Sequence, residues 1–133
     1  MPNSSESYRT ESDSMGEVQV PSDRYWGAQT ERARHRFQIG NDPIPLELIH
    51  AIACLKRMAA HTNHQLGVLD EQRCQWISEA AREVEGGKLD GEFPLTSWQS
   101  GSATQTHKNV NQVIANRACE LAAHARASTD VVH

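Results

Sequence analysis

At 133 residues the chain is long enough for one domain, and its 38% hydrophobic and 23% charged residues describe a globular chain slightly poor in core-forming residues. Its net charge of −4 provides no basic field for a polyphosphate backbone, so we expect no nucleic-acid partner. No segment reaches the ~18 apolar residues of a membrane span, so we expect no membrane partner either.

The cysteines and the N-terminus both point to a cytoplasmic protein. Cys54, Cys74 and Cys119 are an odd number and lie far apart, which suggests neither a zinc spacing nor a disulfide framework. The first residues, MPNSSESYRTESDS, lack the apolar core of a signal peptide. Because this stretch is polar and rich in Ser and Glu, we interpret residues 1–14 as a disordered leader.

The next segment predicts a hairpin and a short helix. Apolar and polar residues alternate around Val18 and Val20 and then meet Pro21, which indicates a short β-hairpin or an extended arm. The charged run that follows predicts a helix over residues 29–37.

Three longer helices are predicted over residues 46–65, 70–85 and 109–125. In the first, apolar positions recur at steps of three and four: Leu48, Ile52, Leu55, Ala59, Thr62 and Leu66. Asp70 is the expected N-cap of the second, and Gly86 and Gly87 end it. The third carries Val110, Ile114, Ala118 and Leu121 along one face. The fold class is therefore mainly α, with antiparallel helix pairs joined by short turns.

Small polar residues gather where the third long helix starts. The run GSAT, residues 101–104, lies between Trp98-Gln99 and the helical segment. Hydroxyls and free backbone N–H groups at the positive end of a helix dipole favour an anion, especially a carboxylate, without a lysine. On pattern alone, an ordinary N-cap loop whose hydroxyls serve only their own helix explains these residues as well.

Two long motifs resemble a known family. FPLTSWQSGSATQTHKNVNQVIANRA, residues 93–118, resembles the first signature region of the class II fumarases, which typically reads FPL, then WQTGSGTQ, then MNxNEVIANRA. DSMGEVQVPSDRYWGAQTERA, residues 13–33, is similar to the opening segment of the same family. The motif residues around Trp98 favour fumarase within the fumarase and aspartase superfamily, and aspartase remains the alternative.

The resemblance implies a lyase that interconverts fumarate and L-malate without a metal or other cofactor. By matching motif positions, the substrate-binding residues are Ser102, Ala103 and Thr104, and Asn109 and Asn111 support the site. Ala103 stands where the family usually has Gly, which puts a methyl group where the backbone needs an unusual conformation.

Other departures from the family pattern lie close by. Thr106-His107-Lys108 replaces the usual SNM, and Gln112 replaces a Glu. His61 and His64 are three residues apart on a predicted helix, but no third ligand is in view, so no metal site is expected.

The resemblance also implies what residues 15–133 lack. His133 matches the His that opens the family's HPND segment, part of a second anion site. No residue matches the family's catalytic base or its central helical bundle, the core of a homotetramer. We therefore expect an N-terminal lyase domain, truncated at its C-terminal end and inactive in isolation. The competing hypothesis is a non-enzymatic, truncated helical paralogue.

Overall fold

The computed structural model describes residues 6–123 and Val132. Within them a two-stranded antiparallel hairpin precedes four α-helices and a short 3-10 helix, which confirms the mainly α class. The elements in chain order are β1 (Tyr8–Asp13), β2 (Gly16–Pro21), α1 (Ala28–Arg36), α2 (Leu46–Gln65), α3 (Glu71–Glu85), η1 (Asp90–Glu92) and α4 (Thr104–Leu121).

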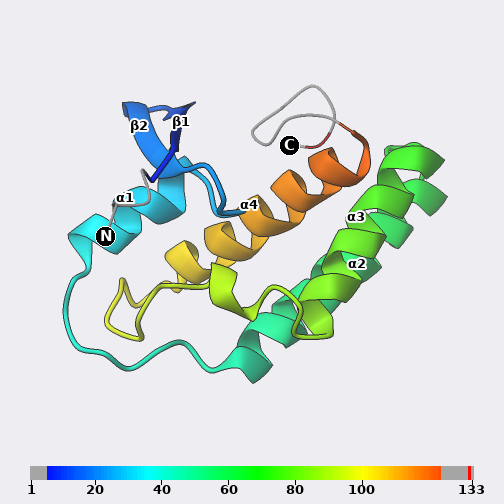
Figure 1. The fold of residues 1–133 in the computed structure, drawn as a ribbon. Coiled ribbons are helices and arrows are strands. Elements are labelled where there is room, and N and C mark those ends of the chain that lie inside the picture. The colour runs from blue at the N-terminus through cyan, green and yellow to red at the C-terminus, as the bar shows by residue number, and fades with distance from the viewer. Residues whose placement is uncertain (1–5, 124–131, 133) are drawn as a thin grey trace.

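Helix α4 is the central element of the fold. It crosses between the hairpin and α1 on one side and the antiparallel pair of α2 and α3 on the other (Figure 1). Its apolar face supplies much of the core, through Val110, Val113, Ile114 and Ala118. Among the described residues no helix is both long and apolar enough to cross a bilayer.

The hairpin is confirmed, but it begins inside the predicted leader. Strand β1 pairs with β2 in a register that places Tyr8 opposite Pro21 and Asp13 opposite Gly16. The prediction of disorder is therefore wrong for residues 8–13, while residues 1–5 lie outside the described residues. The strand is ordered because Arg9 donates hydrogen bonds to the carbonyl oxygens of Pro21, Arg24 and Trp26, contacts that the local sequence does not reveal.

The bounds of α2 are as predicted, but the face that it buries is different. Leu55 is 64% exposed and Leu66 is 72% exposed, although both belong to the stripe that the spacing singled out. The buried side chains lie on a neighbouring face and are mostly small: Ile49, Ala53 and Ala60. Two of these, Ile49 and Ala53, share a buried cluster with Ala80 and Ala81 of α3. The small side chains bring the two helices together and leave the larger side chains of Leu55 and Leu66 on the surface.

The N-cap of α3 was predicted correctly, but the start of α4 was not. Asp70 caps α3 as predicted, because its side chain accepts a hydrogen bond from the backbone N–H of Arg73. Helix α4 begins at Thr104, earlier than the predicted start at Asn109, and it ends at Leu121. The predicted end at Ala125 lies outside the described residues.

Candidate functional site

A chain of hydroxyl groups closes the loop before α4. The Oγ of Ser100 donates to Oε1 of Gln105 over 2.6 Å. The Oγ atoms of Ser100 and Ser102 lie 3.0 Å apart, and Ser102 Oγ lies 2.8 Å from Oγ1 of Thr104. Since each hydroxyl has one proton and Ser100 gives its own to Gln105, the donors run from Thr104 through Ser102 to Ser100. An anion that binds here must turn these hydroxyl groups toward itself and so break the hydrogen bonds between them.

Backbone donors lie beside the hydroxyls. The N–H groups of Thr104 and Gln105 fall in the first turn of α4, where no helical carbonyl is available to them. The N–H of Thr106 is satisfied by Gln99, and that of His107 by the carbonyl of Ala103. Within the part of the chain that the structure describes, the start of α4 therefore offers free N–H groups and two adjacent hydroxyls at the positive end of the helix dipole, which suits a carboxylate.

Ala103 has an unusual backbone conformation, as expected for a position where the family that the sequence resembles usually has Gly. Its φ of 54° and ψ of 18° place it in the left-handed region, and it offers no side-chain cap to α4. An L-residue in this conformation costs about 1–2 kcal/mol because Cβ approaches the following carbonyl oxygen. The loop therefore holds Ala103 in place despite a local penalty.

Gln99 is the residue that holds the loop. Its Oε1 accepts hydrogen bonds from the N–H and the hydroxyl of Thr106, at 3.1 and 2.9 Å. Its Nε2 donates to the carbonyl oxygen of Thr96 over 2.9 Å. One side chain thus joins the two ends of the loop and caps α4 in place of Ala103.

Trp98 fixes the outer edge of the same loop. Its side chain is 57% exposed, and its indole N–H donates to a carboxylate oxygen of Asp42 over 3.3 Å. Gly40 lies directly beneath the ring with a φ of +68°, and a Cβ there would come within 2.5 Å of an indole carbon. The indole therefore requires glycine at position 40, and Trp98 anchors the loop against the segment that contains Gly40 and Asp42.

The structure does not bring all the candidate residues together. Ser102, Ala103 and Thr104 form the hydroxyl loop, but Asn109 is 1% exposed and donates to the carbonyl oxygen of Glu92. Asn111 is exposed, and its amide lies 3.3 Å from Nε2 of His107. Asn109 thus holds α4 against the segment before it. His133 lies outside the described residues.

His107 lies in a cationic environment near this loop. Partial desolvation of the imidazole, followed by the charges of Lys56 and Lys108, holds the pKa of His107 below its usual value. The neutral ring is therefore favoured, because a third positive charge would be repelled by the two lysines.

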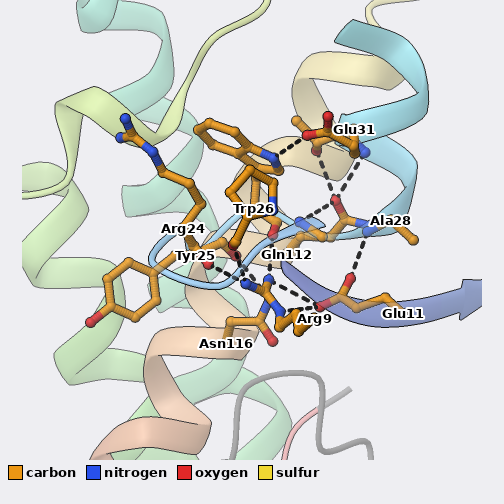
Figure 2. Close-up of polar contacts among 12 residues, drawn as sticks. Arg9, Glu11, Arg24, Tyr25, Trp26, Ala28, Glu31, Gln112 and Asn116 are labelled. Carbon is orange, nitrogen blue, oxygen red and sulfur yellow. Dashed lines mark hydrogen bonds and ion pairs between the residues drawn. The ribbon is translucent and has the colours of Figure 1, made fainter. Parts of the chain in front are cut away.

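A second set of polar contacts, which the sequence did not reveal as a unit, positions α1 against α4 (Figure 2). The carboxylate of Glu11 pairs with Arg9 and accepts a 2.6 Å hydrogen bond from the N–H of Ala28. From α4, Oε1 of Gln112 accepts from the N–H groups of Gly27 and Thr30 and from the Thr30 hydroxyl. The only sequence signal for this capping was the departure at Gln112 from the family's Glu.

The histidines that were considered as metal ligands have other contacts. The ring of His61 lies 3.8 Å from the sulfur of Cys74 and 3.4 Å from the hydroxyl of Ser78, so it links α2 to α3. Nδ1 of His64 lies 3.0 Å from the carbonyl oxygen of Leu69. Within residues 6–123 and Val132, no three His, Cys, Asp or Glu side chains are grouped to hold a metal ion.

A family model described as Lyase matches residues 16–133, and the chain belongs to this family.

Proteins of similar sequence indicate which kind of lyase this chain resembles. The chain is 58% identical over 113 residues to fumarate hydratase class II 2 of Bradyrhizobium diazoefficiens, covering 85% of the chain and 24% of that protein. It is 54% identical over 125 residues to fumarate hydratase class II of Thermosynechococcus vestitus, covering 94% of the chain and 27% of that protein. The chain therefore spans about a quarter of the length of these relatives.

Solved structures agree with the sequence relatives. The class II fumarase of Schistosoma mansoni superposes with a TM-score of 0.88 at 43% identity, over 92% of this chain and 26% of that one. A fumarate lyase:delta crystallin structure from Brucella melitensis gives a TM-score of 0.92 at 34% identity, over 96% of this chain and 30% of that one. The observed hairpin and helices are thus the fold of a fumarase segment.

Proposed function

We propose that this chain is the N-terminal part of a fumarate hydratase, which catalyses the reversible hydration of fumarate to L-malate, and that its role is to bind a substrate carboxylate. The observation that carries the proposal is the pairing of Ser102 and Thr104 beside the free N–H groups of α4. Identity above 50% to proteins named fumarate hydratase class II supports the choice of substrate.

The binding step follows from the donor chain. When a carboxylate arrives, Thr104 turns its hydroxyl proton away from Ser102, and Ser102 turns its proton away from Ser100, so that both point toward the oxygens of the carboxylate. The N–H groups of Thr104 and Gln105 complete the site. Removal of a proton beside that carboxylate produces a doubly charged aci-carboxylate. Fixed donors stabilise this added charge more than the charge of the substrate, so they lower the barrier. The loop needs no metal for this role.

The rest of the machinery belongs to parts of the enzyme beyond this segment. We propose that residues 15–133 form an N-terminal lyase domain within a homotetramer, and that the catalytic base comes from elsewhere in the assembly. His133 is proposed as part of a second anion site, and Asn109 and Asn111 as supporting residues. A cytoplasmic location is proposed because Cys54 and Cys74 are free thiols, as is usual in a reducing compartment.

The test compares the chain with a polypeptide extended to the full length of its relatives. In the extended enzyme, Ser102→Ala or Thr104→Ala should lower kcat/KM for fumarate by roughly a hundredfold or more, the usual effect of losing one preorganised donor. Ser12→Ala, an exposed serine on β1, is the matched control and should leave the rate unchanged. Turnover is followed through the ultraviolet absorbance of fumarate.

Four outcomes would contradict the proposal in different ways. An extended enzyme indifferent to both substitutions would remove the assigned site. Turnover that depends on ammonia instead of water would identify an aspartase. Hydration by the 133-residue chain alone would show that the segment contains its own base, while an extended protein with no turnover would favour a non-enzymatic paralogue.

A further inference from the structure

A cleft of about 990 Å³ opens between the hairpin, α2 and α4. One face of α4 contributes Lys108, Asn111 and Gln112, and α2 contributes Lys56 and Asn63. Glu11 and Asp13 of β1 line the opposite wall, and the lining also includes several apolar side chains: Ala59, Ala60, Ile77, Ile114 and Ala115. The cleft therefore combines an apolar surface with charged groups on two separate walls.

The two walls differ in how their charges are compensated. Glu11 pairs with Arg9, and Asp13 accepts a 2.9 Å hydrogen bond from Nε of Arg32, which lowers the pKa of Asp13. Among the residues that the structure describes, no ion pair is formed by either of the lysines on the other side. The uncompensated charge of the cleft is therefore positive and lies at Lys56 and Lys108.

Both lysines influence the same side chain, the imidazole of His107. Each contributes to lowering the pKa of His107, which places both ammonium groups within electrostatic range of that imidazole. Burial lowers the pKa of Lys56, because its ammonium loses part of its hydration without gaining a counter-ion. An anion between the lysines would supply the missing compensation.

We propose that Lys56 and Lys108, together with the side-chain amides of Asn63 and Asn111, form a binding site for a small dicarboxylate. Two ammonium groups favour a dianion over a monocarboxylate, and the two amides supply uncharged donors for the remaining oxygens. The site rests on these four residues and does not require the hydroxyls of Ser102 and Thr104.

The experiment titrates the chain with succinate and follows the ring resonances of His107 by NMR at constant ionic strength. Succinate should raise the pKa of His107, because it neutralises the lysines that depress it, and acetate should do so far less. Lys56→Met and Lys108→Met should each weaken succinate binding roughly fivefold or more. In the absence of succinate, each substitution should also raise the pKa of His107.

The chain offers a close control, since its only other lysine is Lys88, an exposed residue after α3. Lys88→Met should bind succinate as the parent chain does, and Lys108→Arg should retain binding because it keeps the charge. Circular dichroism checks that each variant is folded. Ser102→Ala should leave the His107 response intact, which separates this site from the proposed carboxylate loop. A His107 pKa insensitive to succinate, or equal binding by Lys108→Met and Lys88→Met, would overturn the proposal.

Discussion

The amide oxygen of Gln112, on α4, accepts hydrogen bonds from both the backbone N–H and the hydroxyl of Thr30, on α1, at 3.1 and 2.7 Å. The same oxygen accepts from the N–H of Gly27 over 3.0 Å. Gln112→Ala leaves the first turn of α1 without this acceptor. We expect the free energy of unfolding to fall by about 1–3 kcal/mol, the cost of leaving partly buried donors unsatisfied.

Urea unfolding measures this loss, with Gln72→Ala on the exposed surface of α3 as the control. Gln112→Glu distinguishes the loss of the hydrogen-bond acceptor from the loss of side-chain volume. It keeps both the volume and an acceptor, and its carboxylate is an acceptor that the helix dipole favours. It should retain or raise stability, by about 0.3–1 kcal/mol in the favourable case. Equal losses for Gln112→Glu and Gln112→Ala would show that the acceptor is not what matters.

The left-handed conformation of Ala103 leads to a stabilising substitution. Ala103→Gly removes the Cβ that this conformation penalises, and it should raise the free energy of unfolding by about 1 kcal/mol after the greater freedom of glycine in the unfolded chain is included. Ala59→Gly, within α2, serves as the matched control and should lower stability by a similar amount. Thermal or urea unfolding of the two variants should therefore give shifts of opposite sign.

Glu31 makes stability depend on acid pH. Burial opposes its ionisation, but hydrogen bonds from Arg34 and Trp26 outweigh burial and hold its pKa below the usual value. A carboxyl group with a lowered pKa in the folded state stabilises the fold above its unfolded pKa, and this stabilisation is lost as the pH falls through the folded pKa. Glu31→Gln should therefore be less stable than the parent chain near neutral pH, with the gap narrowing in acid.

Unfolding at a series of pH values measures that gap. Glu79→Gln, on the exposed side of α3, is the comparison and should give a difference that is small at every pH. A deficit for Glu31→Gln that stays constant from neutral to acid pH would contradict the assignment of the effect to the ionised carboxylate.

How far the sequence predicts this structure depends on whether a signal is local. The bounds of α2 and the N-cap at Asp70 depend on local signals, and both were predicted correctly. The apolar spacing within α2 indicated the wrong buried face, because that face is chosen by the contact with α3. The start of α4 was missed because Gln99 caps it from outside the helix. The roles of Arg9 and Gln112 were missed for a related reason, since each bonds to backbone groups far along the chain. The candidate site residues were predicted through motif resemblance, which does not distinguish the buried Asn109 from the exposed Asn111.

The two apolar faces of α2 give a direct test of the corrected core. Ile49 is 1% exposed, whereas Leu55 is 64% exposed. Ile49→Ala should lower the free energy of unfolding by about 2–5 kcal/mol, because it removes buried methyl groups and leaves a cavity. Leu55→Ala should change it by less than about 0.5 kcal/mol. Urea unfolding of a dilute sample measures both, and comparable losses would indicate that Leu55 is covered in solution.

Gln99 provides the last test, because it joins the two ends of the candidate loop through both atoms of its amide. Gln99→Ala removes the acceptor for Thr106 and the donor to the carbonyl of Thr96, so we expect the first turn of α4 to open more often. Gln99→Glu keeps the acceptor but loses the donor, so it should be affected less. Hydrogen exchange at the amide of Thr106 measures this opening directly, with the amide of Val113, inside the same helix, as the internal reference. The exchange rate at Thr106 should rise in the order parent, Gln99→Glu, Gln99→Ala, while Val113 stays protected. If Thr106 exchanges equally in all three, then Gln99 does not hold the loop, and Ala103 must owe its conformation to other contacts.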